Sequence, residues 1–93
     1  MSRPDVQAIL RFTGNVQGVG FRYTARQVAS GYAITGTVRN CPDGTVECLA
    51  EGTRKEIQAF VDDLHVEMGR YIRDCTCQWA PASGQFADFS VRV

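Results

Sequence analysis

The chain has 93 residues, the size of one domain, and its ten basic and ten acidic side chains cancel to a formal net charge of zero. Broad binding to nucleic acid or to an anionic membrane needs a clustered positive surface, so this balance argues against both partners. Apolar residues make up 44 % of the chain, close to the globular average. We therefore expect residues 1–93 to form a single domain around one core.

Targeting signals and cysteine spacing set further expectations. No apolar run approaches the roughly 20 residues of a membrane span, and the N-terminal residues lack the apolar stretch of a signal peptide. A cytoplasmic protein with reduced cysteines is expected. The spacing Cys75-x-Cys77 is shorter than that of the usual paired metal ligands, so no metal site is predicted. Cys48, Cys75 and Cys77 are interpreted as small apolar core residues, and a disulfide involving Cys75 or Cys77 stays open.

Alternating apolar and polar residues predict five strands, near residues 6–13, 34–39, 46–51, 74–79 and 89–93. A helix with an apolar stripe is predicted to begin near Phe21 or Arg22, and a second follows the capping-box pair Thr53 and Glu56. The turn signal Pro42-Asp43-Gly44 joins the second and third strands into a hairpin. A two-residue Asp43-Gly44 loop would pair Cys41 with Val46, which argues against a Cys41–Cys48 disulfide.

The order of these elements predicts the fold class. Two amphipathic helices can both be buried on one face of an antiparallel sheet. Together with the right-handed crossover preference, this favours an α+β, ferredoxin-like β-α-β-β-α-β sandwich with an antiparallel sheet of four to five strands. The strands near residues 6–13 and 74–79 are the candidates for the central pair.

The segment Gly14–Arg22 carries the clearest chemical signal in the chain. It places three glycines within seven residues, directly before a predicted helix. Glycine lets successive backbone N–H groups turn inward, and such a nest beside a helix N-terminus binds anions. The Arg22 guanidinium adds a permanent charge whose forked donors match phosphate oxygens. The segment predicts a small pocket for a phosphoryl group.

Across essentially its whole length the chain resembles the acylphosphatase family. The matching residues are Gly14, Val16-Gln17-Gly18-Val19-Gly20-Phe21-Arg22, Gly36-x-Val38-x-Asn40, Asp43-Gly44-x-Val46-Glu47 and Gly52. The resemblance implies hydrolysis of small-molecule acyl phosphates to a carboxylate and inorganic phosphate, without a metal ion or organic cofactor. It implies that Arg22 binds the phosphate and that Asn40 positions the attacking water. By the same resemblance, the phosphate cradle is the backbone of Asn15, Val16, Gln17, Gly18, Val19, Gly20 and Phe21.

Two positions depart from the family pattern. Thr37 stands where many relatives carry an aromatic residue, and it is expected to face away from the core. Ala33 stands where relatives often have the glycine that ends the first helix. A left-handed conformation at Ala33 would cost roughly 1 kcal/mol. Neither position touches Arg22 or Asn40 in the sequence pattern.

Two other functions remain open at this stage. One is a module that handles carbamoyl phosphate, like the acylphosphatase-like domain of large hydrogenase-maturation carbamoyltransferases. The other is a non-catalytic ferredoxin-like binding module; those that bind RNA use exposed aromatic residues on central strands. The sequence does not specify the acyl group of the substrate, and a monomer is expected.

Overall fold

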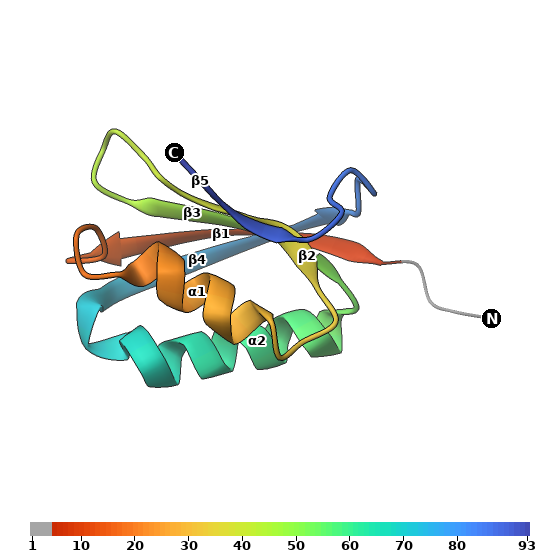
Figure 1. Cartoon of the computed structure of the whole chain (residues 1–93), viewed down its shortest axis with the longest axis horizontal. Coiled ribbons are helices and arrows are strands. Elements are labelled where there is room, and N and C mark those ends of the chain that lie inside the picture. Colours follow the sequence, from red (N-terminus) through yellow and green to blue (C-terminus); the bar gives the residue numbers. More distant parts are fainter. Residues whose placement is uncertain (1–4) are drawn as a thin grey trace.

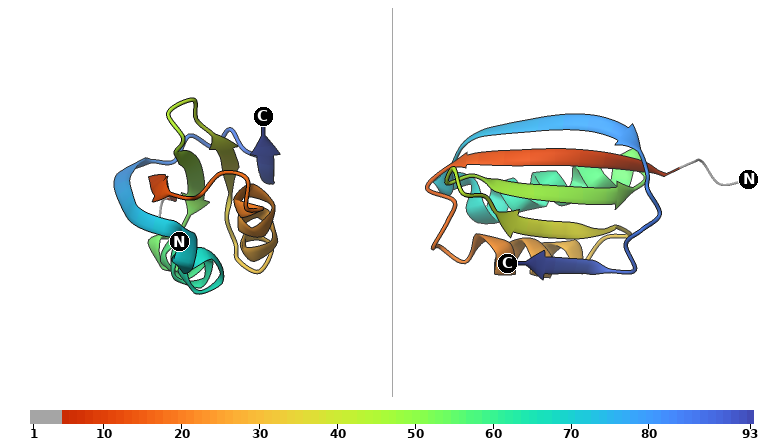
Figure 2. Two further views of the ribbon diagram at one scale, coloured as in Figure 1. Left: turned by 90° about the vertical axis from the view of Figure 1, so that its left-hand side faces the viewer. Right: turned by 90° about the horizontal axis from the view of Figure 1, so that it is seen from above.

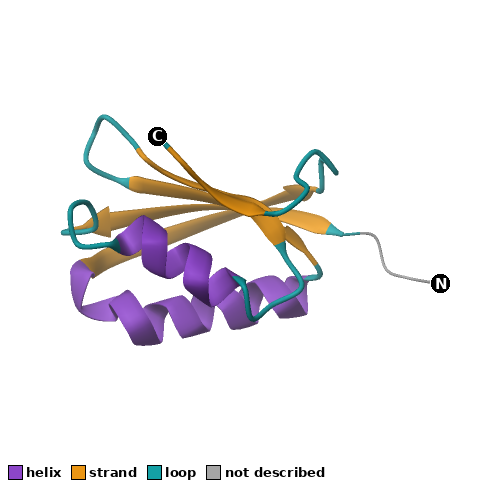
Figure 3. Cartoon of the chain, in the orientation of Figure 1, coloured by secondary structure: helices purple, strands orange, loops and turns teal. Residues whose placement is uncertain are grey.

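The computed structural model describes residues 5–93, which form one five-stranded sheet with two helices on one face (Figure 1 and Figure 3). The strands are β1 (Val6–Gly14), β2 (Thr35–Asn40), β3 (Val46–Gly52), β4 (Ile72–Pro81) and β5 (Phe89–Arg92). The helices are α1 (Phe21–Ala29) and α2 (Arg54–Met68), and a 3-10 turn, η1 (Gly69–Tyr71), joins α2 to β4. The predicted ferredoxin-like class is confirmed. None of the described helices is long and apolar enough to cross a membrane.

The strand order is β4-β1-β3-β2-β5, so the centre of the sheet is β3. The interpretation of the strand near residues 74–79 as central is wrong, because β4 pairs only with β1 and forms one edge. The hairpin strand β3 lies between β1 and β2 instead, with Leu10 opposite Cys48 and Val38 opposite Cys48. This position lets β3 bury Val46, Cys48 and Ala50 completely under the helices.

The fifth strand departs from the predicted antiparallel sheet. β5 runs parallel to β2, with Gly36 opposite Phe89 and Val38 opposite Val91. The segment between Pro81 and Phe89 carries the chain from the β4 edge to the opposite edge of the sheet (Figure 2). The alternation in residues 89–93 predicts a strand but contains no information on its partner or direction, so the mixed sheet could not be predicted.

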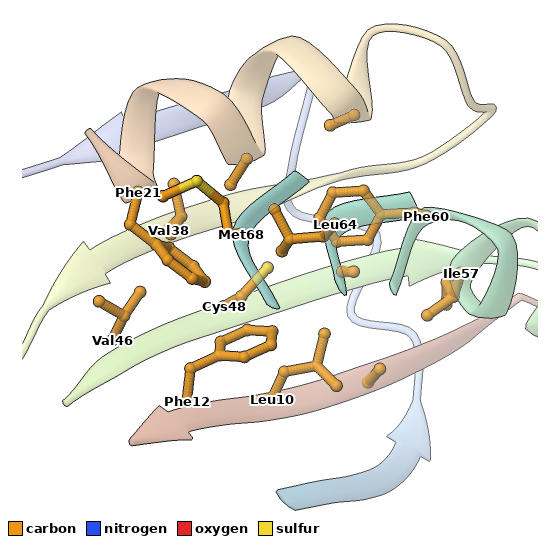
Figure 4. Close-up of a cluster of buried hydrophobic side chains, with 14 of the residues drawn as sticks. Leu10, Phe12, Phe21, Val38, Val46, Cys48, Ile57, Phe60, Leu64 and Met68 are labelled. Carbon is orange, nitrogen blue, oxygen red and sulfur yellow. The ribbon is translucent and has the colours of Figure 1, made fainter. Parts of the chain in front are cut away.

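The core lies between the sheet and the two helices (Figure 4). Its largest fully buried side chains are Phe12, Phe21, Phe60, Leu10, Ile57, Leu64, Val16, Val38, Val46 and Cys48. The interpretation of Cys48 as a core residue is confirmed, and burial raises the pKa of its thiol. Cys75 is only partly buried and Cys77 is exposed, so Cys77 was wrongly assigned to the core; both lie on the edge strand β4. All four cysteines are free.

The β2–β3 hairpin has a longer turn than predicted. Asn40, not Cys41, pairs with Val46, and the Cys41 N–H donates to the Thr45 carbonyl at 2.8 Å. The turn therefore contains three residues and ends in Gly44, which has a left-handed φ of 89°. A three-residue hairpin turn commonly closes with a glycine in this conformation. A Cys41–Cys48 disulfide is absent, as expected.

The two departures from the family pattern introduce no backbone strain. Among the described residues only glycines have positive φ, so Ala33 avoids the left-handed conformation. The Ala33 N–H donates instead to the Glu56 carboxylate at 2.8 Å, while the Glu56 N–H donates to the Thr53 hydroxyl at 3.2 Å. Of the two reciprocal bonds of a capping box, only the one that the Thr53 hydroxyl accepts is therefore present. The Glu56 carboxylate instead joins α2 to the segment after α1. Thr37 alternates with the core residue Val38, so it faces away from the helices, yet it is buried.

Gly36 is the position where the fold tolerates a side chain least. Its φ of 150° is unusual for other residues, and a Cβ there would overlap the Leu49 carbonyl of β3. We expect Gly36→Ala to lower the free energy of unfolding by roughly 3 kcal/mol, because either the β2–β3 pairing or the backbone must shift. Urea denaturation measures this loss.

Gly69→Ala is the matched control. Gly69 has an ordinary helical φ of −58°, and no atom lies within 4 Å of an added Cβ. We expect this variant to match the parent protein or to gain up to about 1 kcal/mol. Equal effects of the two substitutions would show that the close approach of Leu49 to Gly36 does not matter.

Glu51 anchors the segment that crosses from β4 to β5. Its buried carboxylate accepts hydrogen bonds from the Ser83 N–H and hydroxyl, both at 2.8 Å, and from the Gly84 N–H at 3.0 Å. Gln7 donates a further bond at 2.6 Å. Burial alone would raise the pKa of Glu51, but these hydrogen bonds outweigh it, and the net pKa lies below the ordinary value of 4.5.

This lowered pKa predicts a pH-dependent contribution to stability. Ionised Glu51 stabilises the fold above its unfolded pKa, and the contribution is lost as the pH falls through the lower folded pKa. We expect the free energy of unfolding to fall more steeply from about pH 5 to pH 3 in the parent protein than in Glu51→Gln. Thermal unfolding at several pH values measures both slopes, and Glu67→Gln, at an exposed carboxylate of α2, should keep the parent slope.

Candidate active site

Strand direction brings three parts of the chain to one end of the sheet. β1 and β2 both run antiparallel to β3, and β5 runs parallel to β2, so β1, β2 and β5 end on the same side. Figure 2 shows these three arrows pointing to the same end of the molecule. Residues 15–20, here called the glycine loop, leave β1 at that end, where β2 ends in Asn40 and β5 in Arg92.

The glycine loop combines buried valines with exposed glycines. Val16 is fully buried and Val19 packs against the core, so both fasten the loop to the fold. Gly18 and Gly20 are exposed and have left-handed φ angles of 77° and 78°. Left-handed residues within a turn are typical of the backbone nests that bind anions.

Helix α1 begins directly after the loop and has no side-chain cap. Its N-cap residue is Gly20, and the first intrahelical bond runs from the Thr24 N–H to the Gly20 carbonyl at 3.0 Å. The N–H groups of Phe21, Arg22 and Tyr23 therefore have no partner within the helix. The first turn contains no acidic residue that would offset the positive end of the helix dipole. These features suit the binding of an anion at the start of α1.

A cavity of about 270 Å³ lies between the glycine loop, the start of α1 and the ends of β2 and β5. Its lining residues are Val16, Gly18, Gly20, Phe21, Arg22, Tyr23, Asn40 and Val91. Arg22 and Asn40, 18 positions apart in the sequence, thus share one wall. Five of the eight residues predicted to bind phosphate line this cavity, and among them are both exposed glycines of the loop.

The other three predicted residues are not among those that line this cavity. Asn15 lines a neighbouring cavity with Arg70 and Arg73, Val19 packs against the core, and the Gln17 side chain turns toward the hairpin. Tyr23 and Val91 line the cavity but were not predicted. The position of Tyr23 beside Arg22 in the first turn of α1 was an available signal. No signal in the sequence pointed to Val91, because the sequence did not show which strand β5 pairs with.

The Arg22 guanidinium is oriented by a neutral group. Its Nη1 donates to the Arg92 carbonyl of β5 at 2.9 Å. Other arginines at this end are paired with a carboxylate: Arg11 and Arg39 both contact Glu47, at 3.3 and 3.0 Å. Within residues 5–93, Arg22 forms no ion pair, so its charge is available to an anion in the cavity.

Gln17 ties the glycine loop to the hairpin that carries Asn40. Its Nε2 donates to the Cys41 carbonyl at 2.8 Å and to the Thr45 carbonyl at 2.9 Å. Arg11 supports the same turn, because its Nη1 donates to the Thr45 hydroxyl at 2.8 Å. The Thr45 hydroxyl and N–H in turn hold the pKa of Asp43 below its usual range. The two halves of the cavity wall are therefore joined by hydrogen bonds.

The cavity offers groups for binding an anion and for orienting a neutral molecule. Its lining contains one guanidinium, one carboxamide and glycine backbone, but no carboxylate, histidine or thiol. Across the described part of the chain, no three His, Cys, Asp or Glu side chains gather where they could hold a metal ion. The groups at hand can hold a phosphoryl group through the guanidinium and N–H groups, and a water through the Asn40 amide.

Comparison with known proteins shows the family of the chain. The family model named Acylphosphatase matches residues 8–91. An acylphosphatase of Paenarthrobacter aurescens is 39 % identical over 93 residues, covering 98 % of each chain. The crystal structure of acylphosphatase from Bacillus subtilis superimposes with a TM-score of 0.84 at 30 % identity, covering 95 % of this chain and 99 % of that one. Full-length HypF in its phosphate- and nucleotide-bound form matches with a TM-score of 0.80 at 27 % identity, over 99 % of this chain but 12 % of its own. Because the family model and the full-length relatives cover nearly the whole sequence, this chain belongs to the acylphosphatase family.

Proposed function

We propose that this acylphosphatase binds the phosphate of its substrate on the glycine loop and Arg22, while Asn40 orients the attacking water. The observation that carries the proposal is the single cavity in which Gly18, Gly20, Arg22 and Asn40 meet. The proposed phosphate cradle is the backbone of Asn15, Val16, Gln17, Gly18, Val19, Gly20 and Phe21, closed by the Arg22 side chain. The products are a carboxylate and inorganic phosphate, and residues 1–93 act as one domain.

Binding depends on donors that are already in place. The N–H groups at the start of α1 and the left-handed glycines supply neutral donors, and Arg22 supplies the charge. The Arg92 carbonyl occupies one guanidinium nitrogen and leaves the other donors of the fork free for phosphate oxygens. Preorganised donors of this kind also stabilise the charge that develops on the phosphoryl oxygens during transfer.

The chemical step needs little proton transfer from the protein. The leaving group is a carboxylate, which departs without a general acid. Asn40 accepts a hydrogen bond from the water through its side-chain oxygen and aims it in line with the P–O bond to the acyl group. The water oxygen bonds to phosphorus as that P–O bond breaks, and the electron pair leaves with the carboxylate. The proton lost by the water passes to a phosphate oxygen, because no carboxylate or imidazole that could accept it lines the cavity.

Substitution of the two central side chains tests this assignment. We expect Arg22→Lys and Asn40→Ala each to lower kcat/KM for benzoyl phosphate by at least about 100-fold, because each removes donors or positioning needed in the transition state. Lysine keeps the charge but loses the fork. Release of inorganic phosphate measures the rate, and the melting temperature reports whether the fold survives.

Arg54→Ala is the control for loss of a cation. Arg54 lies at the first turn of α2, where its guanidinium sits 4.4 Å from the centre of the Trp79 ring. This variant should hydrolyse benzoyl phosphate at the parent rate. Near-parent activity in a folded Arg22→Lys or Asn40→Ala variant would refute the assigned roles.

Carbamoyl phosphate is the second candidate substrate. The likeness to one part of HypF over 99 % of this chain favours testing it. Carbamoyl phosphate has the same phosphate end as other acyl phosphates, so the same cavity could bind it. Parallel assays with benzoyl and carbamoyl phosphate decide between them: a higher kcat/KM for carbamoyl phosphate would favour a module that handles carbamoyl phosphate.

The Gln17 side chain is proposed to position the glycine loop without touching the substrate. Gln17→Ala removes two hydrogen bonds to the turn that follows Asn40. We expect the free energy of unfolding to fall by about 1–3 kcal/mol, since two part-buried hydrogen bonds are lost while each carbonyl keeps its backbone donor. The inhibition constant of inorganic phosphate should rise as well, because the loop is no longer held against the hairpin.

Gln58→Ala is the matched control for Gln17→Ala. Gln58 is exposed on α2 and donates one bond to Asp62 at 2.9 Å. Such exposed i, i+4 pairs contribute only about 0.2–0.5 kcal/mol, so stability should change little and phosphate inhibition not at all. A Gln17→Ala variant that behaves like this control would show that the loop does not depend on the hairpin.

A further inference from the structure

Exposed apolar side chains gather at the mouth of the cavity. Among the described residues, four large apolar side chains are strongly exposed: Tyr23, Val66, Val91 and Val93. Single exposed apolar residues are ordinary on protein surfaces. Tyr23, 63 % exposed, and Val91, 39 % exposed, however, both line the cavity that holds Arg22 and Asn40. Two of these four exposed apolar side chains therefore border one cavity of about 270 Å³.

The fold holds both side chains in place. Tyr23 follows Arg22 in the first turn of α1, and its hydroxyl accepts a hydrogen bond from the Gln27 Nε2 at 2.6 Å. Val91 lies opposite the core residue Val38 in the parallel β2–β5 pair, so its side chain points to the helix face of the sheet. Its neighbour Arg92 supplies the carbonyl that orients Arg22. The phosphate donors and this apolar surface thus share the same elements.

We propose that Tyr23 and Val91 form the subsite for the acyl group and that this subsite favours aromatic and branched apolar acyl groups over acetyl. This inference rests on the proposed function, because the acyl group must extend from a phosphate held by Arg22 and the glycine loop. Arg22 is the only cationic side chain that lines the cavity and it is committed to the phosphate, so no second cation there can pair with a charged acyl group. A tyrosine ring offers a large, rigid apolar face with few torsions to freeze, which suits contact with a planar acyl group.

The test compares two substrates that differ in the acyl group alone. For the parent protein we expect a higher kcat/KM with benzoyl phosphate than with acetyl phosphate. In Tyr23→Ala the ratio of the two values should fall about tenfold, which corresponds to the loss of one aromatic contact. In Val91→Ala the ratio should fall about threefold, since fewer carbon atoms are removed. Tyr23→Phe, which keeps the ring and loses the bond from Gln27, should stay near the parent ratio.

Val66→Ala is the matched control, because Val66 is 81 % exposed on α2 and does not line the cavity. It should leave both the ratio and the rates unchanged. The inhibition constant of inorganic phosphate should be similar in Tyr23→Ala and the parent protein, which separates the acyl subsite from damage to the glycine loop.

Two outcomes would overturn the inference. One is a Tyr23→Ala variant in which both substrates lose activity equally, as expected if the ring only supports the start of α1. The other is an unchanged ratio in Tyr23→Ala and Val91→Ala. Failure of the proposed function is distinguishable from either, because folded Arg22→Lys and Asn40→Ala variants would then hydrolyse both substrates at near-parent rates.

Discussion

The direction of three strands is the constraint on which the site depends. Because β3 is antiparallel to both β1 and β2, these two strands must end on the same side of the sheet, and parallel pairing adds the end of β5. Residues as far apart in sequence as Arg22 and Arg92 then lie within hydrogen-bond distance. If β2 paired directly and antiparallel with β1, the two strands would end on opposite sides of the sheet. The glycine loop and Asn40 would then be separated, whatever the local sequence of either.

The glycine loop can expose its backbone because its valines are buried. Val16 and Val19 belong to the same packing as the core, so the free energy of burial that stabilises the fold also fixes the loop. Gly18 and Gly20 then adopt left-handed angles without a Cβ, at positions where open space surrounds them. Gln17 adds hydrogen bonds to the hairpin. The loop is thus held by the packing of Val16 and Val19 and by the Gln17 amide, while its two exposed glycines line the cavity.

The sequence predicts local structure well and pairing poorly, for reasons that particular residues show. The alternation of Val6 to Thr13 and the stripe from Ile57 to Met68 depend on neighbours in the chain, and both elements formed as expected. The edge position of β4, the parallel pairing of β5 and the exposure of Cys77 depend on which strands meet. Arg22 is predicted by the glycine-rich segment as well as by the family resemblance, and Asn40 by the resemblance alone. Val91 enters the cavity through the parallel β2–β5 pairing, which the sequence did not indicate.

The partners of the arginines explain how a chain of zero net charge can hold an anion. Arg11 and Arg39 both contact Glu47, and Arg11 also lies 3.8 Å from Asp43, so two carboxylates offset these two charges. Arg22 is oriented by a carbonyl oxygen instead, which fixes the guanidinium through a dipole without cancelling its charge. A carboxylate in place of that carbonyl would compete with the phosphate for the same donors. Neutral orientation of the cation and an uncapped helix start therefore both place positive charge at this cavity.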